Sequence, residues 1–385
     1  MKLLPFDYAI RNLARSPRRL ALVAGGSALV SLLVLGAVAF SRGLDAALVA
    51  SGLATNALLI GSGSEESAER SEIPPSTAGV LAASVDGLAL HAGVPAVASE
   101  IHVALPVHRQ DSAADPDAPP VLVRGYEPAS FAVHPQVRLV AGRWPRSGAD
   151  EVAAGPEALA RVGGAALDDT LAIAGRPFAL VGMFEARGTA MHGELWMRVE
   201  PLAELTQRTT RSCVVAALGD AEFDDIDAFA ASRIDLETVA MRESDYYARL
   251  AEFFGPIRLL VLVTAVLVAS GGVLGGVNAM YAAFASRVRE AGTLQALGFP
   301  RGAIALSLVV ESTVACTAGS LVACLVGIAA LDGVSIRFSM GSFGLAVDSA
   351  AIAAALLAGL LLGAVGALPA ILRCLALPIP DALRA

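Results

Sequence analysis

The stretch LLVLVTAVLVASGGVLGGVNAMYAAFAS fills residues 259–286 and contains no charged side chain. An α-helix needs about 20 apolar residues to cross the hydrocarbon core of a bilayer, which is roughly 30 Å thick. The stretch is longer than this, so it predicts a transmembrane helix. Working outward from it, residues 20–41, 302–331 and 349–372 are similarly apolar. The sequence therefore predicts four transmembrane helices.

The composition of the whole chain supports a membrane protein. Of the 385 residues, 55% are hydrophobic and 17% are charged, and the mean hydropathy is +0.64. These values are too apolar for one ordinary soluble domain. Residues 43–256 differ from the rest because their polarity is that of a normal soluble protein. We expect a membrane part and one large soluble domain.

The first apolar stretch has a competing interpretation as a cleaved signal peptide. Ala37-Val38-Ala39 resembles an A-x-A cleavage site and follows a basic N-terminal segment. The apolar region of a signal peptide usually has about 7 to 15 residues. Residues 20–41 exceed this length, so we favour a transmembrane helix.

The basic residues predict the orientation in the membrane. The segments before residue 20, from 287 to 301 and after 372 together hold ten basic and three acidic residues. By the positive-inside rule these segments are cytoplasmic. Residues 43–256 hold 15 arginines and 30 acidic residues, so this negative domain is expected outside the cytoplasm and is poorly suited to bind nucleic acid.

These observations predict the order of the parts and their boundaries. We expect a bacterial cytoplasmic (inner) membrane protein with both termini in the cytoplasm. The parts are a cytoplasmic amphipathic helix (1–19), transmembrane helix 1 (20–41), an extracytoplasmic α+β domain with stalks (43–256), transmembrane helix 2 (259–286), a short cytoplasmic helix (287–301), transmembrane helix 3 (302–331), an extracytoplasmic loop (332–348), transmembrane helix 4 (349–372) and a cytoplasmic tail (373–385).

The soluble domain has the pattern of a mixed α+β fold. Short apolar runs bounded by Gly, Pro or Asp predict strands at 121–123, 170–174, 177–184 and 213–218. Helices are predicted at 151–162, 220–232 and 243–258, and the last of these is expected to run into transmembrane helix 2 without a break. Residues 44–60 are expected to continue transmembrane helix 1.

No motif of an enzyme or of a metal site is recognisable in the sequence. None of the histidines has the i, i+4 spacing of a zinc helix or a C-x-x-C companion. The pairs Asp168-Asp169 and Asp224-Asp225 are typical of turns and helix starts, and no G-x-S-x-G elbow occurs. No G-x-x-x-x-G-K-[ST] loop occurs either, so any ATP would bind another polypeptide. We predict no catalytic residue, metal or cofactor in this chain. The five histidines are His91, His102, His108, His134 and His192.

Some residues inside the predicted spans are candidates for packing or function. Small residues four apart allow two helix backbones to approach closely, although such spacings also arise by chance in Gly- and Ala-rich helices, and both interpretations stay open. Glu311 lies about ten residues into the third span, where a carboxylate needs a partner, a proton or a water-lined cavity. We favour a structural hydrogen bond, for which Asn278 in the second span is a candidate partner, over proton coupling or substrate contact. The glycine pairs are Gly271/Gly275, Gly272/Gly276 and Gly359/Gly363.

The segment between the second and third spans, SRVREAGTLQALGFPR at 286–301, has the pattern of a short amphipathic helix. Apolar side chains recur at helical spacing, charged residues flank them, and Gly298 followed by Pro300 ends the helix. The segment strongly resembles the ERxREIGTLRALG stretch of MacB/FtsX-type permeases. The residues that carry the pattern and the resemblance are Arg287, Val288, Arg289, Glu290, Ala291, Thr293, Leu294, Leu297, Gly298 and Phe299.

Three further stretches extend this resemblance over most of the chain. AIRNLARSPR at 9–18 is similar to the first helix of these permeases. GRWP at 142–145, Asp150-Glu151 and GRPFALVG at 175–182 are similar to the MacB-like periplasmic core domain. PDALR at 380–384 resembles the closing P-x-E-A-L-R, from which it departs at Asp381.

The resemblance implies the permease subunit of an ABC transporter, of a LolC/LolE- or DevC-like kind. Residues 287–299 would then be the coupling helix, which seats on a separate ABC ATPase present in two copies with its ATP and Mg²⁺. A second permease copy or a paralogue would complete the complex, with or without a periplasmic adaptor or membrane-fusion protein.

The mechanism implied by the resemblance is mechanotransmission, in which ATPase motion reaches the outer domain through stiff stalks and moves an amphipathic or lipidated substrate. One alternative is an FtsX-like regulator of a cell-wall hydrolase, although residues 43–256 are large for that class. Others are export of a peptide, antibiotic or other small molecule, and a membrane-anchored sensor or adhesion protein, which would leave the coupling segment unexplained.

Overall fold

The computed structural model describes residues 17–111, 120–285, 288–331, 334–338 and 341–376. The chain divides into two compact units. The helical unit comprises Met1–Arg42, Pro256–Val334 and Leu345–Ala385, and the sheet unit comprises Gly43–Gly255 and Ser335–Gly344. Nearly all of the predicted helix at 1–19, and the tail from 377 onward, lie outside the described residues.

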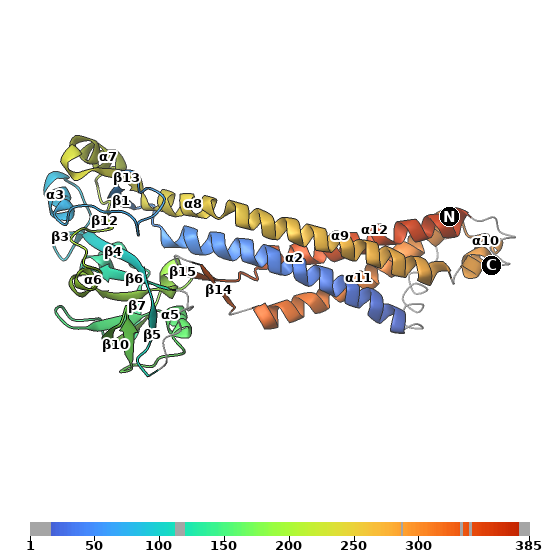
Figure 1. Ribbon diagram of the computed structural model, residues 1–385. Helices are drawn as coiled ribbons and strands as arrows, with labels where there is room; N and C mark the ends of the chain where they lie inside the picture. The colour runs from blue at the N-terminus through green and yellow to red at the C-terminus, as the bar shows by residue number, and fades with distance from the viewer. Residues whose placement is uncertain (1–16, 112–119, 286–287, 332–333, 339–340, 377–385) are drawn as a thin grey trace. The chain divides into compact units, whose positions relative to one another are not determined.

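The helical unit contains four long helices, which run side by side in Figure 1. Each contains a segment long and apolar enough to cross a membrane, which confirms the prediction of four such helices. A short helix, α10, lies between the second and third of them in the chain. The helices are α2 (Pro17–Ser51), α9 (Gly255–Ala285), α10 (Val288–Ala296), α11 (Arg301–Leu331) and α12 (Ser349–Ala376).

Hydroxyl groups and small residues join α2 to α11. Ser27 Oγ donates a hydrogen bond to the carbonyl oxygen of Cys316 at 2.8 Å, and the hydroxyls of Ser31 and Ser320 lie 2.8 Å apart. Near them, Val30 and Leu362 are buried in a shared apolar core. Because each hydroxyl has a partner inside the unit, polar atoms can be buried among apolar helices at little cost.

The sheet unit is built on one mixed sheet, in which most neighbours are antiparallel and β6–β11 and β8–β10 are parallel. Strand β7 (Arg138–Gly142) pairs with β10 beside the main path. The order across the sheet is β13 (Thr238–Arg242), β1 (Asn56–Gly61), β12 (Cys213–Ala217), β4 (Val97–Leu105), β6 (Val121–Tyr126), β11 (Leu195–Arg198), β8 (Glu151–Ala154), β10 (Arg176–Glu185), β9 (Thr170–Ile173) and β5 (Val107–Arg109).

Strand β4 divides the sheet into two halves, each with its own core. Its first residues, through Glu100, pair with β12, and from Ile101 onward it pairs with β6. Helices α3 (Thr77–Ser84) and α7 (Phe223–Ser232) lie on the half around β1, as Figure 1 shows. Helices α5 (Pro156–Arg161) and α6 (Val199–Thr206) pack on the other half. Glu100 therefore sits where the two halves meet.

Short elements complete the sheet unit. In the described part of the chain, β2–β3 and β14–β15 form two-stranded sheets apart from the main one, and the second lies within the segment 332–348 that was predicted as a loop. Helix α8 leads toward α9. The elements are β2 (Leu90–His91), β3 (Val94–Pro95), α4 (Ser130–Val133), η1 (Ala190–Gly193), η2 (Ile234–Leu236), α8 (Glu243–Phe253), β14 (Ser335–Phe338) and β15 (Gly341–Gly344).

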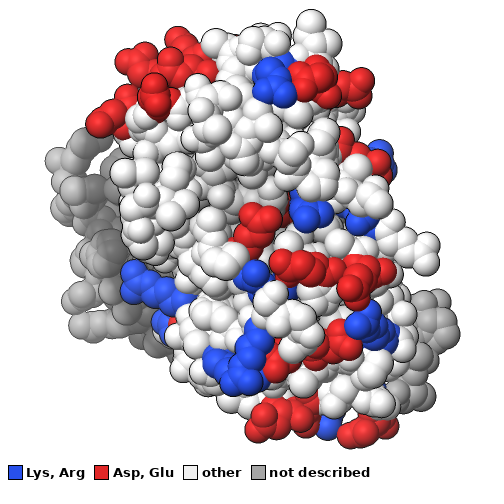
Figure 2. Space-filling view, turned by 90° about the vertical axis from the view of Figure 1, so that its left-hand side faces the viewer, with Lys and Arg blue, Asp and Glu red and all other residues white. Residues whose placement is uncertain are grey.

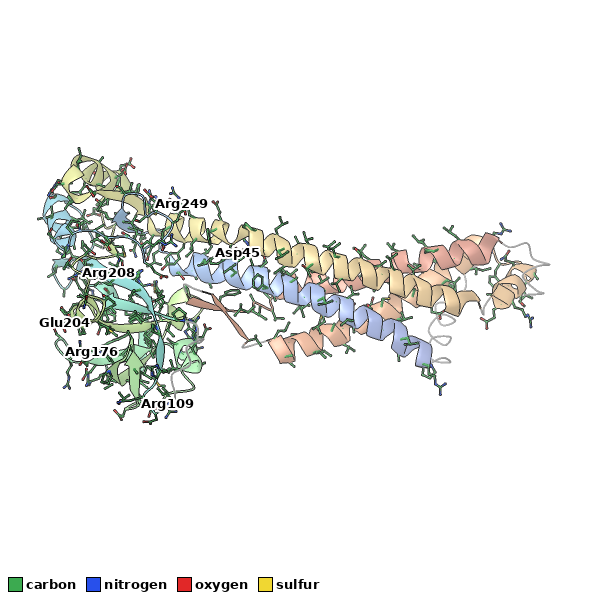
Figure 3. All side chains as sticks on the ribbon, in the orientation of Figure 1. Asp45, Arg109, Arg176, Glu204, Arg208 and Arg249 are labelled. Atoms are coloured by element: carbon green, nitrogen blue, oxygen red, sulfur yellow. The ribbon has the colours of Figure 1, made fainter. Side chains whose placement is uncertain are left out.

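The loop before α3 is fixed to the sheet by one arginine, Arg208, labelled in Figure 3. Its Nη2 donates to the carbonyl oxygens of Glu69 at 3.1 Å and Ser71 at 2.9 Å. Its Nη1 donates to Ser212 Oγ at 2.9 Å. The Gly- and Ser-rich segment 61–76 is thereby held against the sheet.

Three predicted helices differ in the structure. Residues 151–162 were predicted as one helix, but Val152 to Ala154 are buried in β8 between β10 and β11, and α5 begins only at Pro156. A proline at the first helical position suits a helix start, which separates the two elements. Residues 44–60 are helical only to Ser51, because the residues from Asn56 are buried in β1.

The third difference concerns the stalk at 243–258. It was predicted to be continuous with the following span, whereas α8 ends at Phe253 and α9 begins at Gly255. Gly255 and Pro256 at this junction favour a helix break followed by a new helix start.

The sequence predicted a negative surface for residues 43–256 from their net charge. On the face seen in Figure 2, acidic and basic side chains are interspersed.

Candidate coupling helix and a buried charge cluster

The segment predicted to be the coupling helix forms the short helix α10. It spans Val288–Ala296 with Glu290 in its first turn, where an acidic side chain interacts favourably with the helix dipole. Gly298 has a φ of +87°, and the N–H of Phe299 donates to the carbonyl oxygen of Leu294 at 3.1 Å. This is a Schellman-type end, so the prediction that Gly298 terminates the helix is confirmed.

The surface of α10 carries both charged and apolar groups. Arg289, Glu290 and Thr293 are exposed, Leu294 is half-buried, and Leu297 is 66% exposed. Arg287 and the side chains of Val288 and Ala291 lie outside the described part of the chain. An exposed leucine together with exposed charged side chains of both signs is a suitable contact for a partner protein.

Among the intramembrane candidates, Glu311 is buried in α11 with 3% of its surface exposed. Its neighbour Ser312 is buried too, and Glu311 makes an interaction within the chain. Asn278 lies in α9, but its side chain is outside the described residues. The burial of Glu311 agrees with a structural role without testing it.

The predicted packing glycines fall into two groups. A Cβ on Gly272 would overlap Val30 of α2, and one on Gly359 would overlap Ser320 of α11. A Cβ on Gly363 would lie 2.6 Å from Thr313 Cα. These three glycines therefore allow close helix contacts inside this chain. Gly271 and Gly275 face open space, whereas the surroundings of Gly276 are outside the described residues.

A cluster of buried charged residues lies at the centre of the sheet unit. Arg124 on β6 donates to both carboxylate oxygens of Glu194, from Nε at 2.7 Å and from Nη2 at 2.8 Å. Its Nη1 donates to Glu100 Oε2 at 2.5 Å. Trp196 Nε1 also donates to Glu194 at 2.8 Å. The sheet register builds this cluster, because His102 and Trp196 are both cross-strand partners of Arg124.

Two histidines complete the cluster around Glu100. His102 Nε2 lies 3.0 Å from Glu100 Oε2, and His134 Nε2 lies 3.0 Å from Glu100 Oε1. His134 follows α4, and its ring is fully buried. Glu100 is thus surrounded by three nitrogen groups from three segments of the chain.

The surroundings of Glu100 and Glu194 explain why both side chains are deprotonated. Burial on its own raises the pKa of Glu100, but the charges of His134 and Arg124 outweigh this and hold that pKa well below its usual value. Burial likewise raises the pKa of Glu194, and Arg124 outweighs it and lowers the net pKa. Both groups are therefore carboxylates in the folded protein near neutral pH.

Glu100, His102 and Cys213 have ligand-type atoms within 4.8 Å of one another, which is a distance compatible with a bound metal ion. The surrounding contacts do not fit one, because Glu100 Oε2 already accepts from Arg124 and pairs with His102. Burial also raises the pKa of the Cys213 thiol well above its usual value, which disfavours the thiolate that binds metal. We assign no metal to these residues.

A cavity of about 20 Å³ adjoins the cluster, with room for about one water molecule. Tyr246 and Tyr247 of α8 line one side of it, and His102, Arg124 and Glu194 line another. It is too small for a substrate or a cofactor. Among the described residues this cluster is therefore a structural centre of the sheet unit and not an enzymatic site.

The sequence offered only weak signals of this cluster. The histidine spacings indicate no zinc site within a single helix, but His102 of β4 and His134 at the end of α4 both contact Glu100 in the folded chain. Glu100 and Arg124 each stand within an apolar run, at 96–101 and 121–126. A charged residue inside a buried strand needs a partner of opposite charge, and this signal could have indicated the pair.

Comparison with known proteins relates the C-terminal part of the chain to a family. Residues 262–379 match the family described as FtsX-like permease C-terminal. None of the curated proteins searched gives a significant match to the chain. The matched region contains most of α9, all of α10 and α11, and α12, so it includes the candidate coupling helix.

Two solved structures are similar to parts of the chain at low identity. The periplasmic region of MacB from Actinobacillus actinomycetemcomitans is 13% identical with a TM-score of 0.39, and the match covers 53% of this chain and 94% of that one. The extracellular domain of the noncanonic ABC-type transporter YknZ from Gram-positive bacteria is 13% identical with a TM-score of 0.37, covering 48% and 99%.

The family match, the four membrane-length helices and the α+β domain inserted between the first two of them agree with one another. Residues 262–379 therefore carry an FtsX-like permease C-terminal domain, in a chain whose described part has four helices long and apolar enough to cross a membrane.

Proposed function

We propose that this permease transmits the motion of two cytoplasmic ATPase subunits, which bind ATP and Mg²⁺, to the sheet unit on the outer side of the cytoplasmic membrane. There it moves an amphipathic or lipidated substrate, such as a lipoprotein or a lipid-like molecule. The observation that carries the proposal is α10, a short capped helix with Leu297 exposed beside Arg289 and Glu290. Such a helix can receive a mechanical input from a partner.

The length of α2 supports mechanical transmission. Its 35 residues extend over about 52 Å at 1.5 Å per residue, whereas a bilayer core is roughly 30 Å thick. Its last residues, from Gly43, belong to the sheet unit. One helix therefore contributes residues to both units, which is what transmission of a displacement through α2 would require.

The surface of α9 supports a substrate that stays within or beside the membrane. Leu259, Leu260 and Leu267 are all more than 60% exposed, and the hydroxyls of the helical unit described above are hydrogen-bonded to each other or to backbone. Exposed apolar side chains of this kind suit an acyl chain better than a hydrophilic solute. An adaptor or membrane-fusion protein would then receive the substrate.

The open glycines support a second permease copy or a paralogue as partner. Gly271 and Gly275 face open space on the same side of α9, while Gly272 packs against Val30 of α2. Close helix packing through Gly271 and Gly275 would bury the exposed leucines of α9 against a second copy.

Reconstitution tests the function. The permease and its candidate ATPase would be placed in proteoliposomes with a fluorescent lipoprotein, and ATP-dependent release to a soluble acceptor would be followed. We expect release with ATP and none with a non-hydrolysable analogue. Absence of release, together with ATP-dependent activation of a cell-wall hydrolase by the same complex, would instead support the FtsX-like role.

The orientation has its own test, with both termini expected in the cytoplasm. Ser62 in the sheet unit and Ala296 in α10 are both exposed. Cysteine substitutions at these positions, Ser62→Cys and Ala296→Cys, can be probed with a membrane-impermeant thiol reagent in spheroplasts. We expect labelling of Ser62→Cys alone, and labelling of Ala296→Cys alone would reverse the topology.

A further inference from the structure

Two buried side chains, His134 and Glu243, face each other in the sheet unit. His134 Nδ1 lies 3.7 Å from Glu243 Oε1 and has no hydrogen-bond partner among the described residues. The other ring nitrogen of His134 is already bonded to Glu100. The Nδ1 atom is therefore directed at Glu243 across a gap slightly longer than a hydrogen bond.

The second oxygen of Glu243 holds the segment that follows α2. Glu243 Oε2 accepts from the backbone N–H of Leu53 at 3.0 Å and from Asn56 Nδ2 at 2.8 Å. Asn56 Nδ2 also donates to the carbonyl oxygen of Val133, the residue before His134. Glu243 is itself the first residue of α8. The pair thus joins the end of α2, the start of α8 and the sheet at one point.

The contact between His134 and Glu243 needs a proton. If the histidine carries it, an imidazolium faces a carboxylate, and if the glutamate carries it, a carboxylic acid faces a neutral ring nitrogen. Without it, the neutral ring has one proton for two nitrogens that each face a carboxylate, Nε2 toward Glu100 and Nδ1 toward Glu243. One lone pair then faces a carboxylate in a site closed to solvent, which is repulsive. We propose that one proton shared by His134 and Glu243 holds the ends of α2 and α8 together on the sheet, and that losing it as pH rises loosens this junction.

The groups around His134 and Glu243 support a junction that loosens as pH rises. Burial alone lowers the pKa of His134, but the charge of Glu100, its hydrogen bond and Glu243 outweigh burial and raise that pKa. Burial raises the pKa of Glu243, only partly opposed by His134 and by the Leu53 N–H. The other titratable and charged groups that face the pair are Glu100 and His102 of β4, Arg124 of β6, Glu194 before β11, Cys213 of β12 and Tyr247 of α8.

The raised pKa values of His134 and Glu243 both make the junction less stable as pH rises. A group whose pKa is higher in the folded state stabilises that state below its unfolded pKa, and this stabilisation is lost as pH rises through the folded value. The junction is therefore tight in mildly acidic and neutral solution and weaker in alkaline solution. The inference concerns this chain alone and stands whether or not an ATPase drives it.

Hydrogen exchange of the full-length protein in nanodiscs tests the shared proton. Peptides covering residues 50–58 and 243–250 would be compared with a reference peptide from β10, in the other half of the sheet, between about pH 6.5, near the ordinary histidine pKa, and about pH 9. We expect the protection of the two junction peptides, relative to the reference, to fall about tenfold between the two pH values.

The variant Glu243→Gln distinguishes a shared proton from a merely structural contact. Its amide nitrogen can donate to His134 Nδ1 without titrating, and its oxygen can still accept from Leu53 and Asn56. We expect protection that no longer depends on pH, whereas His134→Gln should weaken the junction at low pH and the exposed control His91→Gln should behave as wild type. An unchanged pH dependence in Glu243→Gln, its failure to fold, or flat protection in the wild type would contradict the proposal.

Discussion

The guanidinium of Arg124 and the carboxylate of Glu194 form a two-point pair, at 2.7 and 2.8 Å, inside the sheet unit, where both side chains are at most 2% exposed. Removing the arginine with Arg124→Met would leave the charges of Glu194 and Glu100 without their main counter-charge. We expect the sheet unit to lose about 3 to 5 kcal/mol of unfolding free energy, the usual cost of breaking a buried pair.

Arg176→Met is the matched control for this change. Arg176 also forms a bonded pair, with Asp150 at 2.7 Å, but both side chains are exposed, and Arg176 and Glu204 are seen at the surface in Figure 3. Exposed pairs contribute less than about 1 kcal/mol. Denaturant unfolding of the full chain, followed by hydrogen exchange in β6 and β11, measures both variants. Equal, small losses would show that the buried cluster does not stabilise the fold.

Acid is expected to destabilise the sheet unit through the same cluster. The pKa values of Glu100 and Glu194 are lowered in the folded protein, so their stabilisation is complete above the ordinary carboxylate value of about 4.3 and is lost as pH falls further. Unfolding midpoints measured from neutral pH down to about pH 3 check this. Arg124→Met should reduce this acid dependence, because Arg124 helps to lower the pKa values of both glutamates, and an identical acid transition in that variant would contradict the assignment.

The two groups of glycines are expected to respond differently to a larger side chain. Gly363→Leu would force α12 away from Thr313, and overpacking of this kind costs about 1 to 3 kcal/mol. Gly275→Leu faces open space, so the monomer should fold normally, whereas association of two permease copies should weaken. Thermal stability and size-exclusion chromatography in detergent separate the effects. Normal dimers of Gly275→Leu would rule out this face of α9 as the contact.

Glu311→Gln tests the role of the buried carboxylate in α11. A glutamine can keep a structural hydrogen bond, but it cannot take up and release a proton. We expect a stable complex that retains most of its transport activity. The reconstituted release assay measures this, and complete loss of transport in a correctly assembled complex would favour proton coupling or substrate contact instead.

The sequence was sufficient for the features that local chemistry determines. Uncharged stretches longer than a bilayer requires indicated all four long helices, and the short apolar runs at 170–174 and 213–218 correspond to β9 and β12. The Gly298 end of α10 was also predictable, because a glycine followed by Phe-Pro is a typical helix stop.

What the sequence could not supply depends on long-range pairing. The run from Glu151 has helical composition, yet it forms β8 because β10 and β11 bury it on both sides. The charge cluster has the same origin, since β4 changes partners at Glu100 and thereby brings His102 opposite Arg124. No local pattern around either residue specifies that register.

The central claim, that α10 couples this permease to an ATPase, is tested most directly at Leu297. This side chain is 66% exposed, so aspartate there should not disturb the fold of the chain, whereas Leu294 is half-buried and its replacement could act through misfolding. Ile234→Asp, at an 84% exposed position of the sheet unit, is the matched control.

The measurement is co-purification of the candidate ATPase with wild type, Leu297→Asp and Ile234→Asp, followed by ATP-dependent transport of the reconstituted complexes. An unpaired charge buried at the contact would cost several kcal/mol and weaken binding by orders of magnitude. We therefore expect Leu297→Asp to lose both ATPase binding and transport while Ile234→Asp keeps both. Wild-type binding and transport in Leu297→Asp would contradict the assignment of α10 as the coupling helix.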